Sequence, residues 1–213
     1  DSDGGGARVG GLVGHHASGT ILTSAADVAV QGVNEVGGLV GLVGRAGDSL
    51  AVIGDAYATG SVTGASNVGG LIGTLSHGDI SNVYASGLVT ADSDAGGLIG
   101  GVVTVADGSH TVTHAYWDAD TTGQSSSAGG LGAAINSRTG TINAYTKATY
   151  GTESEGQWTG FDLGDVWFMS EGLTRPFLRM ERSTTVWTAN QLQLMTIGTT
   201  AAYTLADTID LGL

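Results

Sequence analysis

The apolar residues of this chain occur in short runs that are separated by glycine, asparagine, aspartate or serine. Typical runs lie at 50–53, 60–63 and 70–72. Short apolar runs between turn-forming residues predict short β-strands. No segment before Ala133 combines a helix cap with a helical apolar period, so we expect almost no helix there. Hydrophobic residues make up 41% of the 213 residues, which is enough to build a core.

A short glycine motif recurs along the first part of the chain. Gly-Gly-Leu-Val/Ile-Gly begins at residues 10, 37, 69 and 96, and a decayed copy, Gly-Gly-Leu-Gly, begins at residue 129. Successive starting positions differ by 37−10 = 27, 69−37 = 32, 96−69 = 27 and 129−96 = 33. Periods of about 20–50 residues are typical of solenoids and arrays. The repeat positions that we expect to be structural are Gly10, Gly11, Leu12, Gly14, Gly37, Gly38, Leu39, Gly41, Gly69, Gly70, Leu71, Gly73, Gly96, Gly97, Leu98 and Gly100.

A tyrosine keeps a nearly constant distance from the glycine motif that follows it. Tyr57 and Tyr84 each precede the next Gly-Gly pair by twelve residues, since 69−57 and 96−84 both equal 12. Tyr116 precedes the decayed motif by thirteen residues. The extra residues of the longer repeats therefore fall between motif and tyrosine, in 42–52 and 101–111. Length variation at one corner is typical of stacked coils with one variable loop.

These patterns predict an all-β fold, namely a right-handed parallel β-helix (solenoid) in which each repeat forms one coil. Coils stack about 4.8 Å apart, so five coils give a rod of roughly 24 Å. The motif leucines Leu12, Leu39, Leu71 and Leu98 should form one buried ladder, and the flanking glycines should allow tight corners or positive φ. Two alternatives, a flexible linker and a β-propeller, fit less well. The repeats carry regular branched aliphatic residues, and they are shorter than the ~40 residues of a propeller blade.

Composition divides the chain into three predicted parts. Residues 1–135 carry the β-helix coils, 136–182 form an irregular aromatic junction or cap, and 183–213 begin a following repeat unit. The middle part is assigned from its aromatic residues, which are scarce in the coils. These aromatic residues, with one in the last part, are Trp158, Phe161, Trp167, Phe168, Phe177 and Trp187.

The last part is expected to contain one short helix and two strands. Residues 188–191 read as a capping box before a helix at 191–195, and Gly198 is a stop signal. Strand-like patterns follow at 202–205 and 208–211.

Charge and cysteine content exclude several classes of protein. The net charge is −13, with one lysine and six arginines. Nucleic acid is therefore excluded as a partner, because phosphate binding requires a basic footprint. No cysteine is present, so disulfides and thiolate metal sites are excluded as well. No run of about 18 apolar residues lacks a charge, so we predict no membrane span.

The repeated motif resembles the GLUG motif of large bacterial surface proteins. Those proteins include filamentous-haemagglutinin-like adhesins and some immunoglobulin A peptidases. Segment 116–130 resembles the part that closes a run of such repeats, and segments 160–163, 166–167 and 171–179 resemble the junction after it. Residues 189–211 resemble the opening of the next unit. The resemblance implies secretion, a β-helical stalk and roles in adhesion or biofilm formation, but it implies no particular ligand.

No catalytic constellation is visible in the sequence, so we predict that the chain is not an enzyme. The nucleophile elbow, cysteine nucleophile, phosphate loop and His-Glu-x-x-His motif are all absent. The histidines lack zinc-ligand spacing. They are His15, His16, His77, His110 and His114. The candidate carboxylates of a glycan-cleaving site show no repeated pairing. They are Asp79, Asp92, Asp94, Asp107, Asp118 and Asp120.

We predict no cofactor, although the acidic pairs leave room for loosely bound calcium. Asp118 and Asp120 resemble the start of a calcium loop, but position 12 of that loop is Gly129 where glutamate is required. A turn with a side-chain-capped backbone explains them better. The pairs Asp92–Asp94 and Asp1–Asp3 are weaker clusters of the same kind.

The sequence thus predicts a non-catalytic structural and adhesive segment of a large secreted surface protein. The predicted location is extracellular, on the bacterial cell surface. Predicted partners are a protein or glycan on a host or neighbouring cell, and the segment itself is expected to be monomeric. The alternative is a noncatalytic accessory or glycan-binding module of a secreted peptidase or polysaccharide-active enzyme. Trp158, Trp167 and Trp187 suit sugar stacking, but core packing of the junction is the more ordinary explanation.

Overall fold

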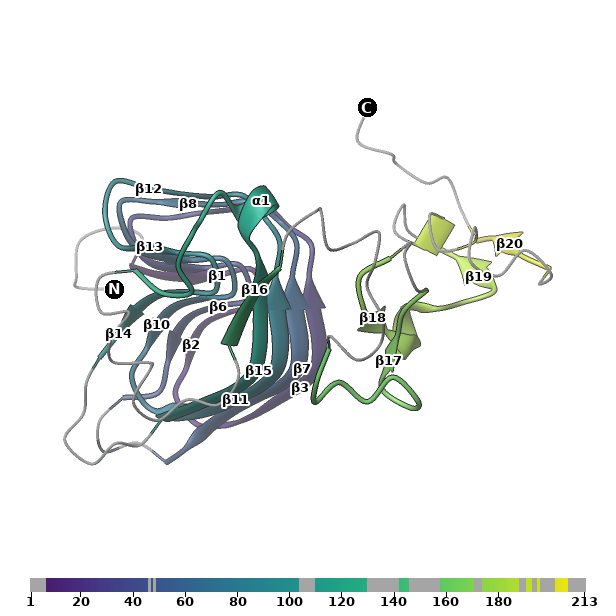
Figure 1. Cartoon of the computed structure of the whole chain (residues 1–213), viewed down its shortest axis with the longest axis horizontal. Coiled ribbons are helices and arrows are strands. Elements are labelled where there is room, and N and C mark those ends of the chain that lie inside the picture. Colours follow the sequence, from purple (N-terminus) through teal and green to yellow (C-terminus); the bar gives the residue numbers. More distant parts are fainter. Residues whose placement is uncertain are drawn as a thin grey trace.

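The computed structural model shows a nearly all-β chain with parallel sheets, which is consistent with a β-helix-like fold (Figure 1). The residues it describes are 7–45, 47, 49–103, 110–129, 142–145, 158–170, 174–187, 191–192, 195 and 202–206. Helix is scarce among them, and helix α1 (Ala119–Thr122) has only four residues.

Four sheets organise residues 7–118, and the chain visits them in a fixed order. Sheet A contains β1 (Ala7–Gly10), β5 (Asn34–Gly37), β9 (Ser66–Gly69) and β13 (Ala95–Gly96). Sheet B contains β2 (Val13–His16), β6 (Val40–Val43), β10 (Ile72–Leu75) and β14 (Ile99–Val102). Sheet C contains β3 (Gly19–Ala26), β7 (Ala51–Ala58), β11 (Gly78–Ala85), β15 (His110–Asp118) and β16 (Ile142–Tyr145). Sheet D contains β4 (Val30–Gln31), β8 (Val62–Gly64) and β12 (Val89–Ala91).

One passage from sheet A to sheet D is called a coil below, and residues 7–118 are called the coil stack. The pairs Val13↔Val40, Val40↔Ile72 and Ile72↔Ile99 give register steps of 40−13 = 27, 72−40 = 32 and 99−72 = 27. These steps equal the spacings of the glycine motif. The five extra residues of the second coil lie between β6 and β7, at 44–50, where the first coil has only residues 17–18.

Each glycine motif forms the corner between sheets A and B, where the two sheets contact each other through their backbones. A β-carbon on Gly37 would lie 2.6 Å from the amide nitrogen of Gly73, in the next coil. A β-carbon on Gly69 would lie 2.5 Å from the amide nitrogen of Gly100. None of the motif glycines has positive φ. Close approach of backbones, and not a left-handed conformation, is therefore what requires glycine at these corners.

The motif leucines lie in the main core, except in the first coil. Leu39, Leu71 and Leu98 are completely buried, together with the valines and isoleucines of sheets B and C. Leu12 is 50% exposed, so the prediction of its burial is wrong. The physical reason is that no described coil covers Leu12 from the other side, whereas each of the other leucines lies between two coils.

Two rows of residues with positive φ, in the left-handed region of backbone conformation, interrupt the strands of sheets A and C. Arg8, Glu35, Asn67 and Asp94 form one row, and Thr23, Asp55, Asn82 and His114 form the other. Each row occupies one position of the repeat, and the strand pairing skips that position. The residue at the skipped position interrupts the alternation of inward and outward side chains along the strand, as a bulge does. In β7 this places Ile53 and Ala56 in the core and leaves Tyr57 on the outer face of sheet C.

The decayed fifth motif does not continue the register of the first four. The amide of Leu71 donates to the carbonyl of Leu98, but the amide of Leu98 donates to the carbonyl of Ser127. Ser127 therefore occupies the place that Leu131 takes in the sequence pattern. Ala128, and not a motif glycine, bridges to Ile99. Residues 130–141 lie outside the described part of the chain.

The C-terminal part contains short strand pairs beside the coil stack (Figure 1). Strands β17 (Trp167–Phe168) and β18 (Phe177–Leu178) pair antiparallel and lead into a 3-10 turn, η2 (Arg179–Glu181). Strands β19 (Thr185–Val186) and β20 (Thr204–Leu205) pair in parallel, so β20 falls within the strand predicted at 202–205. Residues 191–192 are helical, within the helix predicted at 191–195. The predicted strand at 208–211 lies outside the described residues.

Candidate functional site

The outer face of sheet C carries a row of tyrosines. Tyr57, Tyr84 and Tyr116 pair with one another in the registers of β7, β11 and β15. The rings of Tyr57 and Tyr84 stack 4.7 Å apart with an angle of 4° between their planes. Outside this row, the same register position holds Ala25 in β3 and Asn143 in β16. The row therefore begins and ends within the stack, and it forms a bounded aromatic surface.

A segment from the C-terminal part, residues 158–181, covers this row and is called the junction segment. Trp158 lies 4.9 Å from Tyr116 and 5.7 Å from Tyr84, measured between ring centroids. Trp167 lies about equally far from Tyr57 and Tyr84, at 6.0 and 6.1 Å. Trp158 is 3% exposed and Trp167 is not exposed at all. These five side chains form one cluster with Phe161, Met169 and Leu178.

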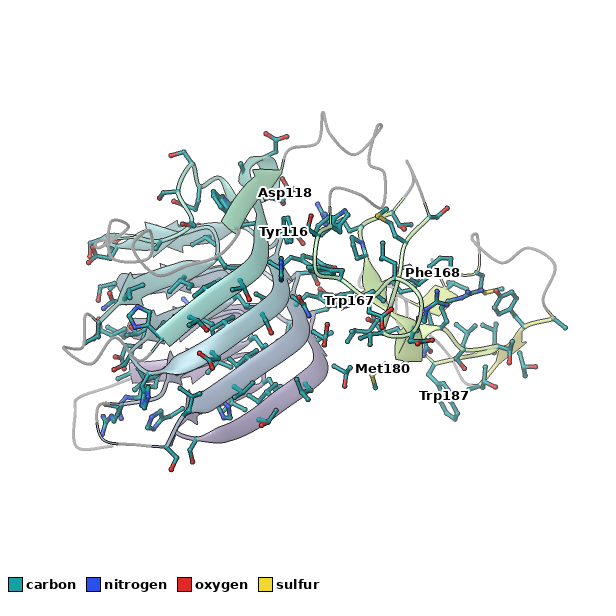
Figure 2. The ribbon with its side chains drawn as sticks, turned by 60° about the horizontal axis from the view of Figure 1, so that its bottom comes forward. Tyr116, Asp118, Trp167, Phe168, Met180 and Trp187 are labelled. Carbon is teal, nitrogen blue, oxygen red and sulfur yellow. The ribbon has the colours of Figure 1, made fainter. Side chains whose placement is uncertain are left out.

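Two hydrogen bonds and one ion pair anchor the junction segment to the coil stack. The indole Nε1–H of Trp167 donates to Asp55 at 2.9 Å, and the Tyr116 hydroxyl donates to the Thr159 carbonyl at 3.1 Å. Arg175 pairs with Asp118 at 2.6 Å. Asp118 is completely buried, so removing Arg175 would leave a carboxylate without its compensating charge. Figure 2 shows Tyr116 and Asp118 on the side of the coil stack that faces Trp167.

A third hydrogen bond joins Tyr57 to the turn after β18. The Tyr57 hydroxyl donates to Glu181 at 2.6 Å, and the other oxygen of Glu181 accepts from the Leu178 amide at 2.9 Å. Burial raises the pKa of Tyr57 well above its ordinary value, and the nearby Glu181 and Asp27 carboxylates raise it further. Tyr57 is therefore a neutral donor at every physiological pH.

Two of the acidic residues singled out in the sequence, Asp118 and Asp79, accept structural hydrogen bonds. Asp118 accepts from the amides of Asp120 and Thr121 and so caps α1, which is the side-chain-capped turn that the sequence predicts. Its second oxygen faces Arg175. Asp79 accepts from Thr111 at 2.6 Å in the next coil. Within the described residues, no group of three His, Cys, Asp or Glu side chains could hold a metal ion.

The tryptophans of the C-terminal part differ in solvent exposure, which the sequence does not indicate. Packing of the junction accounts for Trp158 and Trp167, as expected, but Trp187 is 64% exposed. The prediction of core packing is therefore wrong for Trp187, which follows the last junction contact. Figure 2 shows Trp187 in the C-terminal region, away from Tyr116.

Sequence reasoning missed two junction residues, Arg175 and Glu181. Their partners are 57 and 124 residues away along the chain, and neither residue belongs to a repeated pattern. The spacing of the tyrosines predicts a shared repeat position but not the outward direction of their side chains. The alternation Ala56-Tyr57-Ala58 was the available signal, since small residues in the core leave the residue between them outside.

The fold and the repeat define a class: stacked parallel sheets whose corners carry a repeated Gly-Gly-Leu-Val/Ile-Gly motif. Residues 64–90 match the GLUG motif family, and this range covers one coil from the end of β8 into β12. Among the described residues, no helix has the length and apolar character needed to cross a membrane.

Two particular proteins resemble the chain. Halomucin of Haloquadratum walsbyi (strain DSM 16790 / HBSQ001) is 45% identical over 84 residues, which is 38% of this chain and 1% of halomucin. The crystal structure of a protein from Bacteroides ovatus, named as a candidate immunoglobulin A1 protease, superposes with a TM-score of 0.56 at 18% identity. That superposition covers 82% of this chain and 54% of the other. At this level of identity the likeness concerns the fold alone.

Proposed function

We propose that this chain is a non-catalytic structural and adhesive segment of a large secreted surface protein. In this proposal the four sheets are the faces of a right-handed parallel β-helix, and the parts 1–135, 136–182 and 183–213 are coils, junction and the start of a further unit. The GLUG match and the similarity to halomucin support a surface protein. The location is extracellular, on the cell surface, and the segment is monomeric.

The observation that carries this proposal is that polar side chains form hydrogen bonds and ion pairs with other residues of the same chain. Several carboxylate, tyrosine and arginine side chains, which are of types that often serve in active sites, bind one another here, as in the Asp118–Arg175 and Tyr57–Glu181 pairs. A stack with these internal bonds suits a stiff spacer that presents its loops to another surface. The proposed partner is a protein or glycan of a host or neighbouring cell.

A second candidate is a noncatalytic accessory or glycan-binding module of a secreted peptidase or polysaccharide-active enzyme. The likeness to the Bacteroides ovatus protein and the exposed indole of Trp187 favour this alternative. An exposed indole is a suitable platform for a sugar ring.

Surface display distinguishes the two candidates. Cells that display the full chain should adhere to each other or to immobilised host proteins and glycans, whereas cells that display the unfolded variant Leu71→Asp should not. The soluble chain is tested in parallel on a glycan array, with Trp187→Ala as its matched variant. Array binding that Trp187→Ala abolishes, without adhesion of displaying cells, supports the glycan-binding module. Absence of adhesion under all these conditions contradicts the adhesive proposal.

A further inference from the structure

The 3-10 turn η2 brings two arginines together, Arg179 and Arg182, which are called the arginine pair below. Arg179 is the first residue of the turn, and Arg182 ends it by donating its amide to the Arg179 carbonyl at 3.1 Å. Side chains three residues apart in a 3-10 turn lie over one another, so both guanidinium groups come to the same side of the turn. There they lie over the ring of Phe168. The Cζ atom of Arg179 is 5.4 Å from the ring centroid, and that of Arg182 is 4.6 Å from it.

Hydrogen bonds on either side of the turn fix the arginine pair in place. Glu181, which lies between the two arginines in the sequence, accepts from the Tyr57 hydroxyl of the coil stack. The amide of Arg179 donates to the Val166 carbonyl at 2.9 Å, and its guanidinium group donates to the Leu163 carbonyl at 2.7 Å. A group that is already fixed loses less conformational entropy when a ligand binds to it. The arginine pair is therefore organised for binding in advance.

The charge of the arginine pair is not neutralised by the described part of the chain. No carboxylate among the described residues lies at ion-pair distance from either guanidinium group, whereas Arg175 pairs with the buried Asp118. The Nε–H of Arg179 is buried and has no acceptor among the described residues. The face of the Phe168 ring attracts both cations but does not neutralise them. Because a buried donor without an acceptor is costly, an anionic acceptor would be favourable at this place.

The chemistry of the arginine pair and the charge of the whole chain together favour a ligand with a single carboxylate. A planar guanidinium group matches the two oxygens of a carboxylate and holds it through parallel hydrogen bonds. The net charge of −13 repels a ligand that carries many negative charges. A ligand whose only charge is one carboxylate reaches the arginine pair with much less repulsion.

The residues that follow the arginine pair favour a sugar as the carrier of this carboxylate. Residues 183–185, Ser-Thr-Thr, follow Arg182 directly, and their side chains are exposed or half-buried. Trp187 lies two residues further on and is 64% exposed. Hydroxyl side chains can bond to the hydroxyl groups of a sugar, and an exposed indole is a platform for a sugar ring. Figure 2 shows Phe168 and Trp187 in the same C-terminal region, beside the coil stack.

We propose that the arginine pair is a binding site for a glycan that ends in one carboxylated sugar, such as a uronic acid. Arg179 and Arg182 hold the carboxylate, and the exposed indole of Trp187 is available to a neutral sugar of the same glycan. This inference rests on the proposed function, because it specifies a glycan, and not a protein, as the partner and gives the place where it binds.

Isothermal titration of the full chain with three probes tests this site. The first probe is a neutral oligosaccharide that ends in glucuronate, and the second is the same oligosaccharide ending in glucose. The third is a short peptide whose only charge is one glutamate side chain. We expect the glucuronate probe to bind. The other two probes should bind at least about 10-fold more weakly, because the second lacks the carboxylate and the third lacks the sugar rings.

Substitutions of the arginines test which side chains hold the carboxylate. Arg182 is exposed, so Arg182→Gln should fold, and it should weaken binding of the glucuronate probe by about 10-fold or more. Arg182→Lys should restore only part of this affinity, because an ammonium group cannot form the two parallel bonds. Arg179→Gln should weaken binding to a similar extent. Arg45→Gln removes an exposed arginine from the coil stack and is the matched control, which should bind the probe unchanged.

Equal affinity for the glucuronate and glucose probes would overturn the inference, and so would unchanged affinity in both Arg179→Gln and Arg182→Gln. Binding of the peptide as tight as that of the glucuronate probe would contradict the choice of a glycan. Cell display separates these results from the proposed function. If displaying cells adhere while the chain does not bind the glucuronate probe, the inference fails and the adhesive function stands.

Discussion

The coil stack and the junction segment are held together by contacts of different kinds. In the stack, the backbone pairing and the buried aliphatic contacts recur from coil to coil at the register steps of the repeat. The contacts that join the junction to the stack each occur once and link residues that are far apart, such as Tyr57 and Glu181, which are 124 residues apart. Repetition makes the stack tolerant of loop insertions but intolerant of any change at its glycine corners. The junction depends instead on a few large side chains.

The largest effect is expected at a glycine corner. A β-carbon on Gly73 would overlap the carbonyl carbon of Glu35 and lie 2.5 Å from both the Gly41 oxygen and the Val36 nitrogen. These neighbours are backbone atoms of adjacent strands and cannot move independently. Gly73→Val should therefore unfold the stack at room temperature, with a cost above about 5 kcal/mol. Circular dichroism checks this result, with Gly164→Ala, which meets only the Asp162 side chain, as the control.

The next effect compares one motif position in two coils. Leu71→Asp places an unpaired charge in the core and should cost more than about 4 kcal/mol in the free energy of unfolding. Leu12→Asp changes the same motif residue at a site that is 50% exposed, so it should cost less than about 1 kcal/mol. Urea unfolding measures both values. Equal costs would contradict the difference in burial between Leu71 and Leu12.

A smaller loss of stability is expected for a substitution in the tyrosine row, and it should affect the junction segment more than the coil stack. Tyr84→Ala removes the ring between Tyr57, Trp158 and Trp167, so about 3 kcal/mol of packing is lost from the junction. We expect the tryptophan fluorescence to shift to the red while the strand signal in circular dichroism persists. Trp187→Ala is the control, and it should leave stability nearly unchanged. Simultaneous loss of both signals in Tyr84→Ala would show that stack and junction unfold as one unit.

The smallest effect concerns a single hydrogen bond and its pH dependence. Tyr57→Phe removes the bond to Glu181 and should cost about 1–2 kcal/mol at pH 7. The pKa of Tyr57 is raised in the folded state, so the unfolded chain releases this proton first, near pH 10. The stability that the neutral hydroxyl contributes is complete below that pH and is lost as the pH rises above it. Between pH 8 and pH 11, the Tm should therefore fall less for Tyr57→Phe than for the unaltered chain.

How far the sequence predicts this structure depends on repetition. The motif spacing anticipates the strand registers and the loop that absorbs the extra residues, because both follow from a pattern that recurs. Leu12 and Ser127 depart from expectation because they lie in the first and last described corners, where the regular packing of one described coil on the next stops. Trp187 is exposed although core packing was expected, because hydrophobicity alone does not specify burial. The Asp118–Arg175 pair could not be predicted, since a single contact between distant residues leaves no periodic trace.

The central claim is that the junction segment docks on the tyrosine row of the coil stack. Nuclear Overhauser contacts between the Trp167 indole and the rings of Tyr57 and Tyr84 test this claim most directly. The ring centroid of Trp167 lies 6.0 Å from that of Tyr57 and 6.1 Å from that of Tyr84. The account predicts cross-peaks from Trp167 to both tyrosines, and their loss in Tyr84→Ala. Cross-peaks from Trp167 only to its sequence neighbours, in a chain whose stack is folded, would contradict it.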